Sequence, residues 1–285
     1  MNLVSFPALA CPLDGEPLQA AAGAWRCGSG HSFDIASQGY VHLLPVQYKR
    51  SRDPGDSREM VAARRRFLAA GHYAPIAAAV SRMTLDGLAA QAAFSCLDAG
   101  CGEGYYLARL GEALGAGQRM ATLGLDISKW AVQAAAKRER RATWVVGSNA
   151  NLPVLAGSVD RLLCLFGFPV DGEFARVLRP GGRLLRVDAG PGHLRELREI
   201  IYAEPRRERP AEAAAPPGFA GVASETLSYR LHLDDAGQIA DLLTMTPHLY
   251  RASAAGRARA AALSSLSLTV DVRLQSFERL AGPLP

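Results

Sequence analysis

A glycine-rich loop with acidic neighbours carries the clearest chemical signal in this sequence. Residues 97–106 read LDAGCGEGYY, and Asp126 ends the next apolar segment, 22 residues beyond Gly104. Gly100 and Gly102 allow the backbone to approach a ligand and to adopt positive φ angles, as a nucleotide site at the carboxyl end of a strand requires. The spacing therefore predicts a nucleotide-binding loop between a strand and a helix.

The carboxylates around the loop distinguish between nucleotides. A dinucleotide-binding loop has its third glycine three residues after the second, because the pyrophosphate sits on the helix N-terminus, and Tyr105 occupies that position here. Asp98 and Glu103 would repel a pyrophosphate, whereas the cationic methionyl group of S-adenosylmethionine tolerates them. Asp126 can accept hydrogen bonds from both ribose hydroxyls. The loop therefore predicts an S-adenosylmethionine site.

Residues after the third apolar segment extend this site. Residues 147–149 (GSN) end that segment and residues 151–153 (NLP) follow, where amides or backbone can meet an adenine edge. Cys101 has no histidine near it in sequence, so we expect it to pack and not to act as a nucleophile. The cofactor contacts predicted from these patterns are Asp98, Gly100, Gly102, Glu103, Gly104, Asp126, Ile127, Asn149 and Leu152.

Near the N-terminus, four residues have the types and spacing of metal ligands. Cys11 is followed sixteen positions later by Cys27, with His31 completing a C-x3-H pattern. A zinc ribbon would have a cysteine at position 14, where this chain has Asp14, but a carboxylate oxygen also binds zinc. The alternative is a metal-free hairpin in which the two cysteines are small buried residues.

A basic segment follows this region. Residues 49–66 hold seven Lys or Arg against three acidic residues, within a chain whose net charge is +5. This concentration of charge favours a phosphate-bearing partner, although a solvated face paired with Asp53, Asp56 and Glu59 is the alternative. The predicted phosphate contacts are Lys49, Arg50 and Arg52, with Arg64, Arg65 and Arg66 as a second set of which at most two share one helix surface.

The amino-acid composition bears on the cellular location of the protein and on the state of its cysteines. The five cysteines are an odd, scattered set, which argues against a disulfide framework. No stretch of eighteen apolar residues is free of charges, and the N-terminus lacks the pattern of a signal peptide. We expect a cytoplasmic protein with reduced thiols and no membrane partner.

The elements that position these residues alternate between apolar and helical patterns from about residue 93 to residue 189. This alternation predicts a doubly wound α/β fold with helices on both faces of a mostly parallel sheet. Helices are expected over 57–66, with Ser57 as N-cap, and over 73–88. A flexible connection over 203–218 precedes two terminal strands that can form an antiparallel edge. The predicted units are a zinc-ribbon-like module (1–40), a basic connector with helices (41–90) and the main domain (91–285).

Taken together, these motifs resemble those of a broad enzyme family and of a narrower family within it. The glycine loop, the acidic strand end and the LRPGG turn at 178–182 follow the order of class I methyltransferases, which have a Rossmann-like sheet of seven strands. Residues 11–75, with the KRSRDPGDS block at 49–57, and the later PGHLRELREIIY and DLLTMTPHLYRA segments resemble the bacterial 23S rRNA (guanine-N1)-methyltransferases.

The resemblance implies a zinc-binding N-terminal domain, S-adenosylmethionine as cofactor, 23S rRNA as substrate and a homodimer. The methylated guanine would lie in a hairpin loop of domain II (helix 35). The resemblance also adds Tyr73 and His193 to the cofactor contacts and assigns zinc to Cys11, Asp14, Cys27 and His31. This chain departs from the family at Asp14, usually a cysteine, and at residues 166–169 (FGFP), where a Tyr-Ala-Pro-Cys type sequence is common.

Methylation at guanine N1 needs an unpaired base and a route for the N1 proton. A carboxylate can take that proton, but Asp53, Asp56, Asp171 and Asp188 are equally possible in the sequence, so the base stays unassigned. A small-molecule methyltransferase would suit the apolar FGFP segment. A non-catalytic RNA-binding protein that retains the fold is the other alternative.

Overall fold

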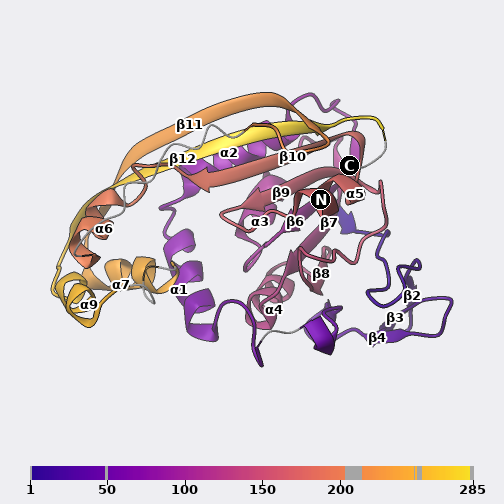
Figure 1. Ribbon diagram of the computed structural model, residues 1–285, viewed down its shortest axis with the longest axis horizontal. Helices are drawn as coiled ribbons and strands as arrows, with labels where there is room; N and C mark the ends of the chain where they lie inside the picture. Colours follow the sequence, from indigo (N-terminus) through magenta and orange to yellow (C-terminus); the bar gives the residue numbers. More distant parts are fainter. Residues whose placement is uncertain (1, 49–50, 203–213, 247, 249–251, 283–285) are drawn as a thin grey trace.

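The structure is a computed structural model that describes residues 2–48, 51–202, 214–246, 248 and 252–282. Its main sheet runs β11-β12-β10-β9-β6-β7-β8-β5, and β1 pairs with β7 (Figure 1). All described pairings in this sheet are parallel except β10 with β12 and β12 with β11, which form the expected antiparallel edge. The strands are β1 (Leu3–Ser5), β5 (Tyr40–His42), β6 (Ala93–Ala99), β7 (Arg119–Asp126), β8 (Thr143–Val146), β9 (Val159–Leu165), β10 (Leu178–Ala189), β11 (Phe219–Leu233) and β12 (Leu266–Arg279).

The predicted number of seven strands is wrong, because the main sheet has nine in the described part of the chain. Strands β6 to β12 are the seven expected ones, and β1 and β5 are added from the N-terminal region. β1 pairs with β7, and β5 pairs with β8. These pairings satisfy backbone N–H and C=O groups of β7 and β8 that would otherwise remain exposed on an edge. The boundaries at residues 40 and 90 stay a prediction, although β1 and β5 join the main sheet from before residue 91.

Helices connect the strands at the expected places. Ser57 accepts a hydrogen bond from the backbone N–H of Met60 and so caps α1, as its sequence predicted. The expected connection over 203–218 lies largely outside the described residues. The helices are α1 (Arg58–Ala69), α2 (Ala74–Leu85), α3 (Tyr105–Glu112), α4 (Lys129–Arg138), α5 (Asp171–Val177), α6 (Arg195–Ile201), α7 (Ala236–Thr244) and α9 (Ala254–Ala261), with a short 3-10 helix η1 (Val46–Tyr48).

Two hydrophobic clusters lie on opposite faces of the sheet. Neighbouring strand residues separate between them: Leu163 and Leu185 belong to one cluster, Leu162 and Leu184 to the other. Helices α1 to α4 contribute to the first cluster, whereas α5 and the N-terminal segment around Phe6 cover the second. The sheet is therefore covered on both faces, as the apolar runs predicted. On one face, however, the N-terminal segment forms part of the covering layer together with α5.

A small three-stranded antiparallel sheet forms the N-terminal module at the lower right of Figure 1. It consists of β2 (Gln19–Ala21), β3 (Ala24–Arg26) and β4 (Ser32–Asp34). No helix of the described residues is long and apolar enough to cross a membrane.

The strand order reverses between β6 and β9. In an open α/β sheet a ligand crevice forms at the carboxyl ends of the strands at such a reversal. The glycine loop that follows β6 lies at this point, so the fold presents the predicted cofactor residues at one edge of the sheet.

Candidate functional site

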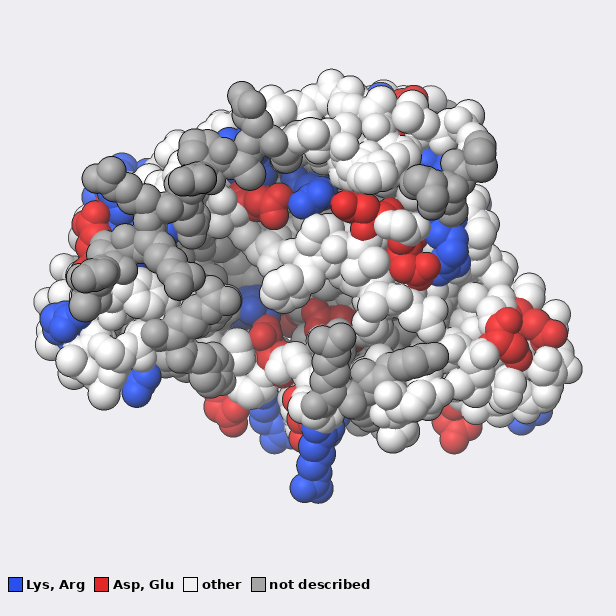
Figure 2. Space-filling view, in the orientation of Figure 1, with Lys and Arg blue, Asp and Glu red and all other residues white. Residues whose placement is uncertain are grey.

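A cavity of about 660 Å³ opens at the carboxyl ends of the central strands, within the size range of small-molecule sites. Figure 2 shows this face of the molecule hollowed near its middle, with acidic and basic side chains around the hollow. Loops after β6, β7, β8, β9 and β10 line the cavity, and α1 closes it from the connector side. The predicted cofactor contacts in its wall are Tyr73, Gly100, Gly102, Glu103, Asp126, Ile127, Asn149 and His193.

The glycine loop is shaped to leave room for a ligand. Gly100 and Gly102 have φ angles of 104° and 55°, and a Cβ atom added at Gly100 would meet no protein atom within 4 Å. A side chain there would enter the space of the cavity. Gly104 serves packing, since an added Cβ would lie 2.7 Å from the ring of Trp144. Cys101 is buried, and burial raises the pKa of its thiol, as expected of a packing residue.

Asp98 lies behind this loop as a buried carboxylate. Its side chain is 1% exposed, and neither carboxylate oxygen has a hydrogen-bond partner among the described residues. Burial, with the nearby charges of Asp126 and Glu103, raises the pKa of Asp98 to about 8. An orphaned acid beside an open glycine loop fits a ligand with a cationic group, such as the methionyl part of S-adenosylmethionine.

Asp126 is held in place by two backbone donors. Its Oδ2 accepts from the N–H of Gly102 at 2.9 Å, and its Oδ1 accepts from the N–H of Ser128 at 2.8 Å. The Ser128 hydroxyl donates to the carbonyl of Asp56 at 2.6 Å, which ties the connector to this strand end. The oxygens of Asp126 retain further lone pairs, so they can accept from ribose hydroxyls as predicted.

Tyr73 and His193 meet although 120 residues separate them in the sequence. The Tyr73 hydroxyl lies 3.4 Å from His193 Nε2, and His193 Nδ1 accepts from the backbone N–H of Asp271. Because Nδ1 is an acceptor, the proton of the neutral ring is on Nε2, which donates to the Tyr73 oxygen. Burial lowers the pKa of His193 to about 4, so the ring is neutral at pH 7. The Tyr73 hydroxyl proton thus remains available for an acceptor in the cavity.

The structure shows how two other predicted cofactor residues, Asn149 and Leu152, are held. The Asn149 side-chain amide donates to the carbonyls of Ala99 and Phe168, at 3.3 and 3.1 Å, which leaves its own oxygen free to accept. Leu152 is buried outside the cavity wall, and its N–H donates to Glu173. Asp98 and Gly104 likewise lie outside the wall, behind the loop.

The predicted basic residues lie in different parts of the structure. Arg64 lines the cavity, where it forms an ion pair with Asp56 and donates to the carbonyl of Met245 at 2.9 Å. Arg66 pairs with Asp241, and Arg65 is exposed. Arg52 lies outside the cavity and lines a smaller pocket of about 50 Å³ beside Trp130. Lys49 and Arg50 lie outside the described residues.

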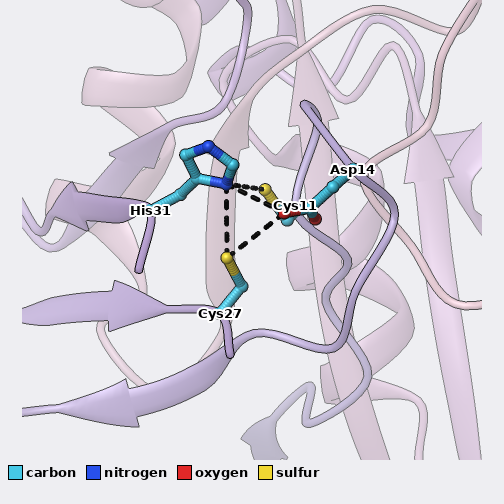
Figure 3. Close-up of side chains that lie close together, drawn as sticks. All are labelled: Cys11, Asp14, Cys27 and His31. Atoms are coloured by element: carbon cyan, nitrogen blue, oxygen red, sulfur yellow. Dashed lines mark hydrogen bonds and ion pairs between the residues drawn. The ribbon is translucent and has the colours of Figure 1, made fainter. Parts of the chain in front are cut away.

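The four predicted metal ligands converge in the N-terminal module (Figure 3). His31 Nδ1 lies 3.5 Å from Cys11 Sγ, 3.4 Å from Cys27 Sγ and 2.9 Å from Asp14 Oδ2, and all four ligand atoms lie within 4.8 Å of one another. Zinc–ligand bonds of 2.0–2.3 Å in a tetrahedron imply ligand separations of about 3.3–3.8 Å. The backbone N–H of Glu16 lowers the pKa of Asp14 to about 2, so Asp14 is a carboxylate at neutral pH. The donor set therefore fits zinc.

Part of the cavity wall was not predicted from the sequence. Arg198, Met245, Thr246 and His248 line it from the C-terminal half of the chain. No spacing pattern marks these residues as ligand contacts. Only the resemblance of two segments to the family pointed to their regions, PGHLRELREIIY for Arg198 and DLLTMTPHLYRA for the other three residues.

The strand order, the glycine loop and the two carboxylates define the main domain as a class I methyltransferase, for which S-adenosylmethionine is the methyl donor. A family model described as "Methyltransferase domain" matches residues 96–182. A zinc-ribbon model described as "RlmA, N-terminal" matches residues 9–52.

Similar proteins identify the family more narrowly. The chain is 36% identical to a candidate 23S rRNA (guanine-N1)-methyltransferase of Micromonospora griseorubida, over 95% of this chain and 97% of that one. It is 37% identical to the 23S rRNA (guanine(748)-N1)-methyltransferase of Streptomyces fradiae, over 82% of each chain. A candidate 23S rRNA (guanine-N1)-methyltransferase of Bacillus subtilis (strain 168) is 30% identical, over 94% and 96%. The chain belongs to the family of 23S rRNA (guanine-N1)-methyltransferases, as the motifs indicated.

Proposed function

We propose that the protein transfers a methyl group from S-adenosylmethionine to N1 of a guanine in 23S rRNA, in the hairpin loop of domain II known as helix 35. The observation that carries the cofactor part is the buried, unpartnered carboxylate of Asp98 behind an open glycine loop. The similarity to named 23S rRNA enzymes over most of the chain supports the acceptor.

Different residues at the cavity then bind different parts of S-adenosylmethionine. The carboxylate of Asp98 lies behind the glycine loop and attracts the cationic methionyl group through its charge, and Asp126 accepts from the ribose hydroxyls. The free oxygen of Asn149 accepts from the adenine amino group, and Tyr73 donates to the methionyl carboxylate. The sulfonium of the bound cofactor supplies an electrophilic methyl group, so the main task of the protein is to align that methyl group with N1.

RNA contacts belong to exposed positions of the connector. Arg65 is exposed on α1, and Arg52 lies near Lys129 and Trp130, where cation and aromatic side chains can meet phosphate and base. Arg64 serves the cavity wall through its ion pair with Asp56. We retain Lys49 and Arg50 as predicted phosphate contacts.

Two further features belong to the proposal. Zinc bound by Cys11, Asp14, Cys27 and His31 would hold the N-terminal module together, and metal analysis of the purified protein tests it. We also propose a homodimer, which the resemblance to the family supports, and a cytoplasmic location. Light scattering measures the mass of the particle and so tests the dimer.

Transfer of a labelled methyl group to unmodified 23S rRNA tests the reaction. We expect incorporation into 23S rRNA, and into a domain II transcript, but not into 16S rRNA of the same preparation. Incorporation into small aromatic acceptors without any into RNA would instead favour a small-molecule methyltransferase. Binding of the cofactor without transfer to any RNA would favour a non-catalytic RNA-binding protein.

A further inference from the structure

The loop between β9 and α5 places two phenylalanines at the cavity. Phe166, Gly167 and Phe168 all line it, yet the side chain of Phe168 is 88% exposed. Phe166 has a φ angle of 53°, a costly conformation for a bulky residue. Its ring lies about 6 Å from the rings of Tyr73 and His193, at 6.2 and 6.0 Å between centroids. The loop therefore packs one ring against the cofactor residues and leaves the other open to solvent.

Neighbouring elements hold this loop in place. The N–H of Phe166 donates to the carbonyl of Val187 at 2.8 Å, and the amide of Asn149 donates to the carbonyl of Phe168 at 3.1 Å. An added Cβ at Gly167 would lie 3.3 Å from Cys164 Sγ, so the backbone is closely packed there. The exposed ring of Phe168 thus stands on a fixed backbone at the wall of the cavity. A flat apolar face so placed suits stacking with a planar ligand group.

The carboxylates that line the cavity differ in how they are engaged. Asp56 pairs with Arg64, and Asp126 accepts from two backbone N–H groups. Glu103 is 2% exposed and lies 3.6 Å from Arg138. Asp188 differs, because its side chain is 47% exposed and its ion-pair distance to Arg186 is 3.9 Å, beyond a hydrogen bond.

Asp188 also lies next to the phenylalanine loop. It follows Val187, whose carbonyl binds Phe166, so Asp188 and the loop occupy the ends of the adjacent strands β10 and β9. The charged groups around Asp188 are Arg186 on β10, Asp171 on α5 through its contact with Arg186, and Arg273 opposite it on β12. Arg186 and Arg273 are therefore the cationic neighbours of Asp188, and an oxygen of its carboxylate can accept a proton from a group in the cavity.

We propose that the acceptor guanine stacks on Phe168 and that Asp188 takes the proton from its N1. This inference rests on the proposed function. The N1–H bond breaks as the proton passes to a carboxylate oxygen of Asp188. The electron pair left on N1 forms the new bond to the methyl carbon, and the pair of the broken S–CH₃ bond stays on sulfur, which loses its positive charge.

The pair of residues also accounts for a choice between purines. Stacking on Phe168 is tolerant of base type, because each base has a π face. Adenine N1 carries no proton, so its lone pair would face the carboxylate of Asp188 and repel it. Guanine presents an N–H donor at that position. Phe168 therefore captures an unpaired base, and Asp188 selects guanine.

Binding of RNA without turnover tests the stacking. Wild type, Phe168→Leu and Phe168→Tyr are compared by fluorescence anisotropy on a labelled domain II hairpin, with S-adenosylhomocysteine present to block transfer. We expect Phe168→Leu to weaken binding about 5- to 100-fold, because stacking on one aromatic ring is lost. Phe168→Tyr keeps the ring and should bind as wild type. All three should bind S-adenosylhomocysteine equally, since Phe168 is exposed.

A hairpin with an abasic site at the methylated position separates stacking from other contacts. Without a base to stack, wild type and Phe168→Leu should bind this RNA equally. If Phe168→Leu bound the intact hairpin as tightly as wild type, or lost the same factor on the abasic hairpin, the stacking would be refuted.

Single-turnover methylation as a function of pH tests Asp188. Asp188→Asn should slow transfer while leaving RNA affinity unchanged, and its rate should rise about tenfold per pH unit as hydroxide removes the N1 proton instead. Asp171→Asn is the matched control, because Asp171 contacts the same Arg186 without lining the cavity, and it should keep the wild-type profile. An unchanged profile in Asp188→Asn would overturn the role of Asp188. Absence of methylation by wild type would instead refute the proposed function.

Discussion

Replacing Asp98 with asparagine should change how the stability of the cofactor-free protein depends on pH. Burial raises the pKa of Asp98 from 3.8 to about 8 in the folded chain. A group with a raised folded pKa contributes stability that is present below its unfolded pKa and is lost as pH rises through its folded pKa. From pH 5 to pH 8 the wild type should therefore lose about 3–4 kcal/mol through Asp98, at about 1.36 kcal/mol per pKa unit. The side-chain amide of Asp98→Asn does not titrate, so the variant should keep this stability.

Urea unfolding of both proteins at pH 5, 6, 7 and 8, without cofactor, measures the difference. Titrating groups remote from Asp98 contribute equally to both proteins. The free energy of unfolding of Asp98→Asn should therefore increase relative to that of wild type as pH rises. Asp86→Asn is the control, because the Asp86 side chain is 71% exposed and its substitution should change the free energy of unfolding little.

The Asp98→Asn variant should be the more stable protein at high pH, but it should bind the cofactor more weakly than wild type. Ionised Asp98 attracts the cationic methionyl group, so calorimetry should show wild-type affinity for S-adenosylmethionine rising with pH toward about 8. Asp98→Asn should bind more weakly and without this dependence. A stability difference that stays flat from pH 5 to pH 8, together with equal cofactor affinity, would refute the assignment of Asp98 as the buried acid of the site.

Three further changes probe other parts of the site. Asp126→Asn should weaken S-adenosylmethionine binding roughly 10- to 100-fold, since a charged acceptor for the ribose hydroxyls is lost, as calorimetry would measure. Asp14→Cys should make zinc harder to remove by a chelator, because thiolate is a softer ligand than carboxylate, as a competition assay would show. The double substitution Arg52→Ala with Arg65→Ala should lower the slope of log RNA affinity against log salt by about 1–2, as salt titrations would show.

Each of these changes has an outcome that contradicts it. Wild-type cofactor affinity in Asp126→Asn would remove the ribose contact from the account. Equal chelator resistance in wild type and Asp14→Cys would show that position 14 is not a ligand. Arg109→Ala is a control for the salt experiment, because Arg109 pairs with Glu112 on the exposed face of α3. A slope change as large as that of the double variant would contradict a local RNA surface.

The cofactor loop was predictable because its chemistry is local in sequence. The types and spacing of Asp98, Gly100 and Gly102 indicate both a close ligand approach and a cationic ligand. The structure adds the orphaned state of the carboxylate, which depends on burial by distant elements. Tyr73 and His193 came only from the resemblance, since their contact is created by the order of strands and not by any local pattern.

Other features depend on tertiary structure that the sequence patterns do not carry. Strands β1 and β5 have three residues each, too few to show an alternating pattern, and they form because β7 and β8 offer free edges. Arg64 was expected among phosphate contacts, but the rotation of α1 against the sheet brings it to Asp56 in the cavity. Leu152 follows β8, the third of the strands expected from the sequence, yet the chain turns so that its side chain packs in the core.

Mapping the modified nucleotide tests the central claim most directly. Unmodified 23S rRNA is incubated with the protein and S-adenosylmethionine and then copied by reverse transcriptase, which stops at a base methylated on its Watson–Crick edge. We predict one new stop at a guanine of the domain II hairpin loop, which is lost when the cofactor is omitted and reduced by Asp126→Asn. Cofactor binding without a stop at any guanine of that loop would contradict the account.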